Sequence, residues 1–520
     1  MRIMQMTFTQ CLIGLLSLCM IWSAPQAAMP TAERDALLAI YNSTGGGSWS
    51  NQGNWNGPVG SECFWVGVYC DQNERVQALA LPANNLVGPL PPDALRPFSN
   101  ITLVMLYGNK LSGALPDING LVKLQDFIVG SNQFTGSIPA LANVPALLNY
   151  DVTGNQLSGG LTPQTAALNL KMYAVANNAL SGNLSAFGIG HPNLETVLIG
   201  KNQLSGNLMS LANFPKLLDF RAENNQLSGS IPTFSSSPLL ANFDVSFNQL
   251  TGAIPSLGNL PKLSTFSVNN NQLSGAVPSL ANNPLIAQFR AYKNQLSSNL
   301  PALGNLPNLT FYDVSSNLLT GSVPSLQGVP NLSYLSVHSN QLSGSLPSLS
   351  SLAKLSKLVV SFNQFTGNLP SLAANPLLTS FEANDNQFSG SIPDLSNNLL
   401  LERLNVSLNQ LSGIIPPVAQ LSKLAALMLD NNQLVGYIPT LPSTSLKNFF
   451  AANNRLTGSL PSLVNYPLLS IFAVNDNQLS GTIPPFGNVP KLSLFYVYNN
   501  QLTGNLPSVP SVSPAFSYYG

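Results

Sequence analysis

Apolar side chains recur with a fixed pattern along most of the chain, and one unit shows this pattern clearly. Phe266 and Val268 alternate with the polar residues Thr265, Ser267 and Asn269. Alternation with a period of two and one apolar face predicts a short, half-buried β-strand. The same unit contains four more apolar residues that we expect to point inward, namely Leu250, Ile254, Leu257 and Leu263.

This unit repeats along the chain from about residue 79 onward. Each copy has an asparagine just after the predicted strand, and these asparagines are 23 residues apart, except for single spacings of 25, 24 and 22. One unit buries too little apolar surface to offset the entropy of its backbone, whereas stacked units share faces and pair strands. The period therefore predicts a solenoid whose turns are marked by Asn84, Asn109, Asn132, Asn155, Asn178, Asn202, Asn225, Asn248, Asn271, Asn294, Asn317, Asn340, Asn363, Asn386, Asn409, Asn432, Asn454, Asn477 and Asn500.

The repeated asparagine stands where the chain leaves its strand and bends. Its amide can donate two hydrogen bonds and accept one, so we expect it to pair backbone groups that the bend leaves open. Gly252 is expected to permit a backbone shape that a side chain would forbid. Pro255 and Pro261 disfavour a helix on the opposite side, where we expect short strands and single 3₁₀ turns. In the middle of the array, the predicted structural ladder comprises Asn225, Asn248, Asn271, Asn294, Asn317, Asn340 and Asn363.

Charge is scarce in this chain. The 20 basic and 20 acidic residues cancel, and charged residues make up only 8% of the sequence. Such a surface lacks the electrostatic attraction that binds nucleic acid or an anionic membrane, so we expect neither as a partner. The apolar content of 44% argues against disorder.

Residues 1–28 have the pattern of a signal peptide. The apolar run from Cys11 to Trp22 is too short to span a bilayer, and Ala24, Ala27 and Ala28 offer a cleavage region. The alternatives are an uncleaved anchor and a lipoprotein acylated at Cys19. No later segment is long and apolar enough to cross a membrane, so we expect a secreted, extracellular protein, or a periplasmic or cell-surface one in a bacterium.

Cleavage of this peptide would leave only two cysteines, Cys63 and Cys70. A close pair in an exported chain is typical of a disulfide bond, although a reduced pair is the alternative. A zinc site would need two further ligands, and none lies nearby in the sequence. We therefore predict no metal site.

The repeated Asn-x-Leu-Ser/Thr-Gly-x-Ile/Leu-Pro resembles the plant-type class of leucine-rich repeats. The segment CFWVGVYC, from Cys63 to Cys70, resembles the N-terminal cap of that family, as do the helix-like segment Glu33 to Tyr41 and the tryptophans Trp49 and Trp55. The resemblance implies a right-handed solenoid of the α/β class, mostly β, with a parallel sheet on its concave face. Together with the signal peptide and the period, the resemblance gives a domain organisation of a signal peptide at 1–28, a cap at 29–75, about 19 repeats of 23 residues at 76–507 and a tail at 508–520.

The chain departs from this family in several ways. Its turn is one residue shorter than the usual 24, and Ser298 replaces the glycine of its unit. Pro261 stands where the family more often has a helix-friendly residue. The sequence shows neither a transmembrane helix nor a kinase, so we expect a free-standing module rather than a transmembrane receptor kinase.

The outward positions of each predicted strand lie six, four, two and one residues before the repeated asparagine. Near the ends of the array these residues are mostly small or neutral, but in the middle they become charged and aromatic. Exposed aromatics and arginines are typical interface anchors, whereas pairing across strands to keep the sheet soluble is the competing interpretation. The predicted partner-binding residues are Asp219, Arg221, Glu223, Asp244, Arg290, Tyr292, Phe311, Asp313, Tyr334, His338, Lys357, Glu382 and Arg403.

No pattern of residues indicates an active site. His191 and His338 belong to different repeats, and Asp219 and Glu223 would lie roughly 10–13 Å apart on a strand, too far for a glycosidase pair. We therefore predict a monomeric, non-enzymatic protein without a cofactor. It would recognise a protein partner through its concave face, as a receptor-like or cell-surface interaction module. The alternatives are an extracellular glycan partner, with binding to cell-wall polysaccharide or inhibition of a secreted polysaccharide hydrolase, and ice binding.

Overall fold

The computed structural model describes residues 28–161, 167–184, 191–508 and 517–519. The predicted signal peptide therefore lies outside the described residues except for Ala28, and so does most of the predicted C-terminal tail. The chain divides into two compact units. The first comprises the described residues of Met1–Thr135 with Leu141–Leu147, and the second comprises Gly136–Ala140 with Leu148–Gly520.

The first unit begins with a cap built around tryptophans. Helix α2 (Thr31–Ser43) buries its apolar face, and the short 3₁₀ helices η1 (Gly46–Ser48) and η2 (Glu62–Phe64) follow. Trp49 packs edge-on against Trp55 with ring centroids 4.8 Å apart, and Trp55 lies 5.0 Å from Trp65. The structure thus contains the helix and the packing tryptophans that the resemblance predicts for this segment. Buried aromatic rings supply much of the apolar area in so small a cap.

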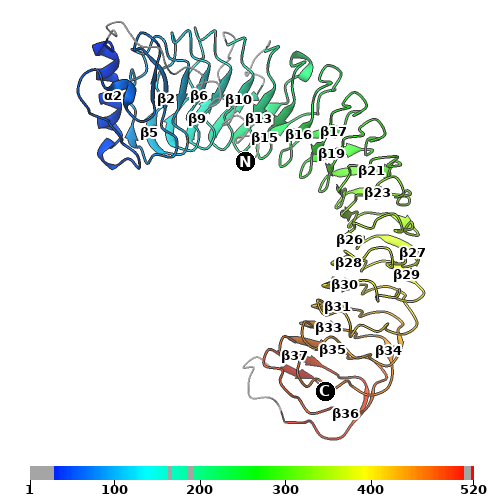
Figure 1. Cartoon of the computed structure of the whole chain (residues 1–520). Helices are drawn as coiled ribbons and strands as arrows, with labels where there is room; N and C mark the ends of the chain where they lie inside the picture. Colours follow the sequence, from blue (N-terminus) through cyan, green and yellow to red (C-terminus); the bar gives the residue numbers. More distant parts are fainter. Residues whose placement is uncertain (1–27, 162–166, 185–190, 509–516, 520) are drawn as a thin grey trace. The chain divides into compact units, whose positions relative to one another are not determined.

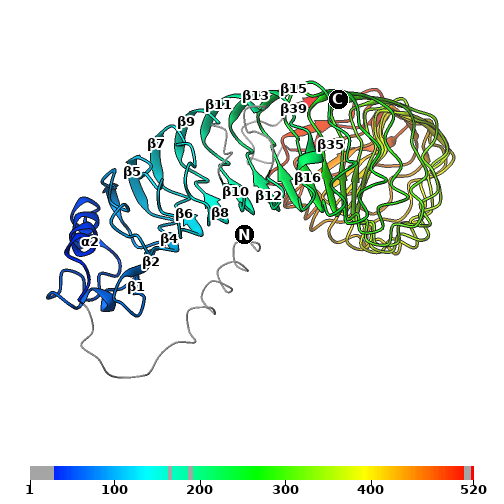
Figure 2. The ribbon, with the colours of Figure 1, turned by 90° about the horizontal axis from the view of Figure 1, so that it is seen from above.

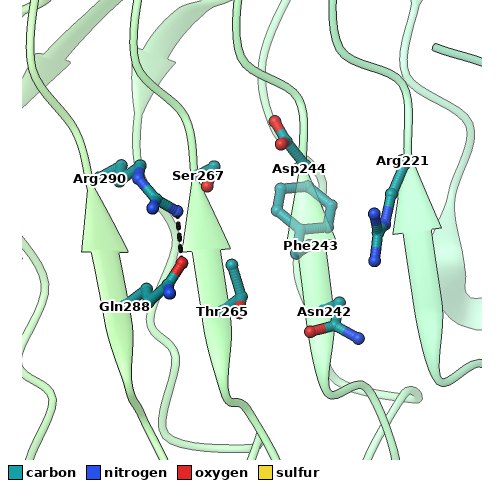
Figure 3. Close-up of a pocket in the computed structure, with 8 residues that line it drawn as sticks. All are labelled: Arg221, Asn242, Phe243, Asp244, Thr265, Ser267, Gln288 and Arg290. Atoms are coloured by element: carbon teal, nitrogen blue, oxygen red, sulfur yellow. Dashed lines mark hydrogen bonds between the residues drawn. The ribbon is translucent and has the colours of Figure 1, made fainter. Parts of the chain in front are cut away.

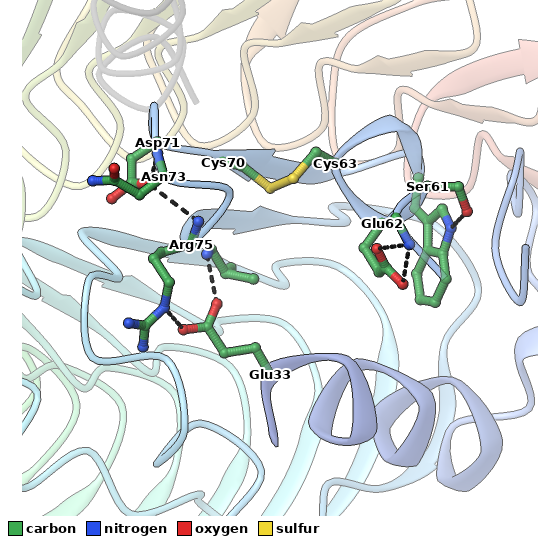
Figure 4. The surroundings of a disulfide bond; sticks show 11 residues. Glu33, Ser61, Glu62, Cys63, Cys70, Asp71, Asn73 and Arg75 are labelled. Atoms are coloured by element: carbon green, nitrogen blue, oxygen red, sulfur yellow. Dashed lines mark hydrogen bonds and ion pairs between the residues drawn. A yellow bond between two sulfur atoms is a disulfide. The ribbon is translucent and has the colours of Figure 1, made fainter. Parts of the chain in front are cut away.

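A disulfide bond joins Cys63 to Cys70, as predicted (Figure 4). Next to it, β1 (Val68–Cys70) runs antiparallel to β2 (Val76–Ala80). The buried carboxylate of Glu33 on α2 accepts hydrogen bonds from Arg75 Nε at 2.5 Å and from the Val76 amide at 2.7 Å (Figure 4). Helix α2 is therefore tied to β2 by the carboxylate of Glu33, whose charge would be costly to bury without these partners.

Each turn of the first unit contributes one strand to a parallel sheet. Strand β2 pairs with β4 (Leu103–Met105), and β4 pairs with β6 (Asp126–Ile128). A second set of short strands runs along the side of the turns and comprises β3 (Val87–Pro89), β5 (Lys110–Ala114) and β7 (Gln133–Gly136).

The second unit continues the same architecture with a long parallel sheet, which lines its inner, concave side (Figure 1). Equivalent residues of successive repeats lie directly opposite each other, as Phe243, Phe266 and Phe289 do. The concave strands are β8 (Asn149–Asp151), β10 (Met172–Ala174), β12 (Thr196–Leu198), β14 (Asp219–Arg221), β16 (Asn242–Asp244), β18 (Thr265–Ser267), β20 (Gln288–Arg290), β22 (Phe311–Asp313), β24 (Tyr334–Ser336), β26 (Lys357–Val359), β28 (Ser380–Glu382), β30 (Arg403–Asn405), β31 (Ala426–Met428), β33 (Asn448–Phe450), β35 (Ile471–Ala473), β37 (Leu494–Tyr496) and β39 (Ser517–Tyr519).

A row of lateral strands runs along one flank of this unit, and Figure 2 shows β9, β11, β13 and β15 on the edge opposite β8, β10 and β12. Within residues 191–508 the remaining convex connections are turns, apart from the 3₁₀ helix η4 (Leu211–Asn213). The lateral strands are β9 (Gln156–Gly160), β11 (Ala179–Asn183), β13 (Gln203–Asn207), β15 (Gln226–Ser228), β17 (Thr251–Ala253), β19 (Gln272–Gly275), β21 (Gln295–Asn299), β23 (Leu318–Thr320), β25 (Ser343–Gly344), β27 (Gln364–Asn368), β29 (Gln387–Ser389), β32 (Val435–Gly436), β34 (Arg455–Leu456), β36 (Ser480–Thr482) and β38 (Gln501–Thr503).

The lateral strands pair with a shift that the concave strands lack. Thr251 of β17 lies opposite Gln272 of β19, although Ser274 is the residue equivalent to Thr251 in the repeat. Each lateral strand is therefore displaced by two residues relative to its neighbour. Gly252 and the other glycines at this position adopt positive φ, and Ser298 has a φ of 73° in the repeat that lacks the glycine.

The core of each turn consists of the inward residues that the pattern predicts. Leu250, Ile254, Leu257, Leu263, Phe266 and Val268 are all buried. Under β14 to β22 the middle residues of the strands form a continuous aromatic stack. Its members are Phe220, Phe243, Phe266, Phe289 and Tyr312, with neighbouring ring centroids 5.4 to 5.7 Å apart.

The repeated asparagines connect neighbouring turns. Asn317 Nδ2 donates to the carbonyl oxygens of Ala291 and Val314, at 3.0 and 3.1 Å, and its Oδ1 accepts from the Leu296 amide at 2.9 Å. Asn225, Asn248, Asn271, Asn294, Asn340 and Asn363 make the equivalent donor bonds, and each accepts from a backbone amide of the preceding turn.

Candidate binding face

The predicted partner-binding residues all lie on or directly after the concave strands β14 to β30, and they form three groups. The outward positions of these strands flank buried middle residues, which form the aromatic stack from β14 to β22 and are leucine or phenylalanine from β24 to β30. The face is consequently supported by a rigid floor, since close-packed side chains leave little freedom for the backbone above them.

The first group lies on β14 and β16. Arg221 forms two hydrogen bonds with the carboxylate of Asp219, from Nε and Nη2, both at 2.9 Å. Asp219 is itself buried, so it acts by fixing Arg221 rather than as an exposed contact. Asp244 follows on the next strand and accepts from the Ser246 hydroxyl at 2.6 Å.

Glu223 completes this group and has an unusual environment. Its carboxylate fills the space above Gly200, where a Cβ atom would lie 2.3 Å from Glu223 Oε2. This oxygen is buried without a hydrogen-bond partner. Burial raises the pKa of Glu223, with a further increase from Asp244. A glycine at position 200 is what gives this side chain room to fold down against the sheet.

The second group lies on β20, β22 and β24 and is built from a cation and two aromatic rings. Arg290 Nη1 donates a hydrogen bond of 2.7 Å to Gln288 Oε1, and this bond orients the guanidinium group. The guanidinium lies 4.6 Å from the centroid of the Phe311 ring. Phe311 in turn stacks on Tyr334, with centroids 4.3 Å apart and an interplanar angle of 5°. Lys357 is the next residue in this row and is exposed.

The remaining members of the second group lie deeper or further along the strands. Asp313 is buried and accepts hydrogen bonds from the amide and hydroxyl of Ser315. Burial raises the pKa of Asp313, and the bonds from Ser315 oppose this increase. Tyr292 and His338 are half-buried at the strand ends, and His338 Nδ1 lies 2.9 Å from the Ser339 hydroxyl.

The third group is an ion pair between neighbouring strands. Arg403 Nε on β30 lies 3.3 Å from Glu382 Oε1 on β28. Pairing across strands therefore accounts for Glu382 and Arg403. In contrast, Arg290 and Lys357 form no ion pair among the described residues.

A hollow of about 250 Å³ separates the first group from the second. Arg221 and Arg290 stand at its two ends, and residues of β16 and β18 lie between them (Figure 3). Three strand spacings of about 4.8 Å place the two arginine backbones roughly 14 Å apart. The sequence pattern did not single out the neutral residues that line this hollow, which are Asn242, Thr265, Ser267 and Gln288.

The residues that the structure describes contain no group of three or more His, Cys, Asp or Glu side chains that could hold a metal ion. No helix among them is long and apolar enough to cross a membrane.

Comparisons with known proteins agree with this architecture. No protein-family model matches the chain. A probable inactive receptor kinase of Arabidopsis thaliana is 38% identical over 85 residues, which are 16% of this chain and 12% of that protein. An inactive leucine-rich repeat receptor-like kinase of the same plant is 43% identical over 102 residues, or 20% of this chain and 15% of that protein. The chain thus matches only a small part of the length of these relatives.

Two solved structures match much more of the chain. The plant peptide hormone receptor RGFR1, solved in complex with RGF2, has a TM-score of 0.78 and 29% identity over 84% of this chain and 72% of its own. The Arabidopsis receptor kinase HAESA, solved with the peptide hormone IDA and the co-receptor SERK1, has a TM-score of 0.75 and 29% identity over 92% and 86%. Together with the capped, asparagine-linked parallel solenoid, these similarities show that the chain has the leucine-rich-repeat fold and is similar to leucine-rich-repeat proteins of plants.

Proposed function

We propose that this chain is a binding protein rather than an enzyme, and that it recognises a protein partner with the concave face from β14 to β30. The observation that carries this proposal is the stack of Arg290, Phe311 and Tyr334. Aromatic and arginine side chains that are already held in place lose little entropy on binding, which makes them effective interface anchors.

The hollow beside this stack supports the same proposal. It is wide enough for one side chain of a partner, and its walls offer the guanidinium groups of Arg221 and Arg290 as donors and Asp244 as an acceptor. A partner segment that lies across the strands would fill the hollow and cover the aromatic pair at the same time. Both features belong to neighbouring strands, so one continuous contact can include them.

The solved relatives support a protein partner over a glycan. RGFR1 and HAESA were both solved with peptide hormones bound. The concave face of this chain differs from a regular ice-binding array, because charged and aromatic side chains interrupt its small polar residues. We also propose that the chain is exported as a monomer after cleavage of residues 1–28. N-terminal sequencing of the secreted protein should begin at Met29, and an intact Met1 would contradict this part of the proposal.

The proposal can be tested with individually purified secreted proteins and peptides of the source organism. Each would be measured against the full chain by biolayer interferometry. For a true partner, the double variant Phe311→Ala, Tyr334→Ala should weaken binding at least tenfold, since two central anchors are removed. The matched control is Phe64→Ala, because Phe64 is a 74% exposed aromatic residue that belongs to the cap and not to the strands from β14 to β30.

Two results would overturn the proposed function. The first is a partner whose affinity is the same for the double variant and for the Phe64→Ala control. The second is a chain that binds none of the proteins or peptides but is retained by insoluble polysaccharide. The melting curve of each variant, followed by circular dichroism, shows whether the solenoid remains folded.

A further inference from the structure

The lateral flank of the second unit has a surface very different from its concave face. Its outward residues lie one, three and five positions after each repeated asparagine. From Gln156 to Gln433 none of these residues is charged, and most are Gln, Ser, Thr or Asn. Backbone hydrogen bonds such as Ser412 N to Gly390 O (2.7 Å) and Val435 N to Gly413 O (2.9 Å) continue the lateral pairing between these turns.

Apart from the isolated Leu318 of β23, which is 49% exposed, large apolar residues break the polar pattern of these rows in one place. Ile414, Val435 and Tyr437 occupy outward positions there, with exposed fractions of 59%, 40% and 71%. Ile414 and Tyr437 occupy the same position in consecutive repeats, and this position holds Ser391 in the repeat before Ile414. The position of Val435 holds Ser412 one repeat earlier. Because serine suffices in the neighbouring repeats, the solenoid itself does not require apolar side chains at these positions.

The three apolar side chains are neighbours rather than scattered residues. A Cβ atom at Gly436 would lie 3.0 Å from Ile414 Cγ2, so Ile414 covers the backbone between Val435 and Tyr437. Large exposed apolar residues are unremarkable singly, but contiguous groups mark interaction sites. We call this group the flank patch, and it consists of Ile414, Val435 and Tyr437.

A cation stands at the edge of the flank patch. Arg455 lies directly opposite Val435 in the register of β32 and β34. Its side chain is exposed, and it takes part in no ion pair among the described residues. The flank from Gln156 to Gln433 offers no charge of either sign, so Arg455 has no acidic neighbour on these rows. An exposed guanidinium beside apolar groups is complementary to a carboxylate that is flanked by apolar side chains.

We propose that the flank patch and Arg455 form a second docking site, which takes a protein segment with apolar side chains next to an Asp or Glu. Tyr437 and Arg455 are residue types that are enriched among interface anchors. The patch is smaller than the about 800 Å² per partner of a stable interface, so it acts as the anchor of a contact that extends over the polar flank. This site is independent of the concave face and does not rest on the function proposed for it.

A peptide library of random 12-residue sequences displayed on phage provides a concrete probe. The full chain would be immobilised and panned, and enriched sequences would be synthesised and measured by biolayer interferometry. We expect them to share apolar residues beside an acidic residue. The triple variant Ile414→Ser, Val435→Ser, Tyr437→Ser should weaken these peptides at least tenfold, and Arg455→Gln should weaken them three- to tenfold.

Matched controls separate this site from simple adhesion and from the concave face. The variant Ser389→Ala, Ser391→Ala changes the same flank one repeat earlier and should leave affinity within twofold. Phe311→Ala, Tyr334→Ala should also leave it unchanged, so the two proposals can fail separately. Thermal unfolding of the triple variant checks whether strand-forming Ile, Val and Tyr serve only to stabilise the lateral sheet.

Several outcomes would overturn the inference. Enriched peptides that bind the triple variant as tightly as the unaltered chain would show that the patch is not the site. Peptides without an acidic residue, insensitive to Arg455→Gln, would reduce the effect to nonspecific apolar contact. A lower melting temperature of the triple variant with unchanged peptide binding would assign these residues to fold stability alone. Binding of soluble glycans at Tyr437, without binding of any peptide there, would contradict the inference, because the partner would then belong to a different class.

Discussion

Removal of one ladder amide should destabilise the solenoid far more than its small size suggests. The substitution Asn317→Ala deletes the donor bonds to the carbonyl oxygens of Ala291 and Val314 and the acceptor bond from the Leu296 amide. Asn317 is buried, so water cannot easily replace these bonds. Each buried polar group left without a partner costs about 1–3 kcal/mol. Three such groups predict a loss of at least about 3 kcal/mol in the free energy of unfolding.

The assay combines chemical denaturation with amide hydrogen exchange. Denaturation followed by circular dichroism measures the loss of stability, while exchange at Leu296 reports the ladder locally, because this amide donates to Asn317. A loss of about 3 kcal/mol corresponds to exchange roughly 150-fold faster, since each 1.4 kcal/mol is a factor of ten. The matched control is Asn305→Ala, an exposed asparagine on the same turn, which should change stability by less than about 0.5 kcal/mol. If the two variants unfolded at the same denaturant concentration, with unchanged exchange at Leu296, the structural role of the ladder would be refuted.

Three further predictions concern the cap, the core and a buried carboxylate. Replacement of Cys63 and Cys70 by serine should lower the free energy of unfolding of the first unit by about 2–3 kcal/mol, because the short closed loop restrains the unfolded chain. If the near-UV dichroism of the tryptophans melted at the same temperature in this variant as in the unaltered chain, the prediction would be contradicted. Phe266→Ala should lower the free energy of unfolding by about 3–5 kcal/mol, because it leaves a cavity in the aromatic stack. The denaturation midpoint measures this loss, and a midpoint shift no larger than that of an exposed substitution would contradict the prediction. Burial raises the pKa of Asp313 above that of the unfolded chain, so its ionised form costs stability at neutral pH, and this cost fades as the pH falls through the folded pKa towards 3.8. Asp313→Asn, which can still accept hydrogen bonds from Ser315, should therefore be more stable than the unaltered chain at pH 7 and lose this advantage near pH 4. An advantage that grows as the pH falls would show that the pKa of Asp313 is lowered rather than raised.

The sequence predicted the positions of the candidate residues better than their roles. Arg290, Phe311 and Tyr334 were all expected on the outer side of the concave strands, and the structure adds that they touch. Asp219 and Asp313 were expected there as well, but both are buried. Their burial depends on the sizes of side chains in the next repeat, which no pattern within one repeat can show.

The features that sequence reasoning missed had only indirect signals. The hollow exists because Thr265 and Ser267 of β18 are small while the long side chains of Arg221 on β14 and Arg290 on β20 stand at its two ends. The flank patch appears in the sequence only as an interruption of Ser, Thr and Asn by Ile414 and its neighbours. Both signals become visible once equivalent positions are aligned along the array, and neither has meaning until those positions are known to be adjacent in space.

The sequence by itself determined the repeat, the buried face of each strand, the ladder asparagines and the cap disulfide. These follow from local rules, because the alternation of side chains and the two donors of an amide act within one turn and its neighbour. Only the tertiary structure decided which outward residues meet. Concave strands pair with equivalent residues opposite, while lateral strands pair with a shift of two, so that Thr251 faces Gln272. The register of each face is a property of the packing between neighbouring turns, and that register is what brings residues from different repeats together into a binding face or a flank patch.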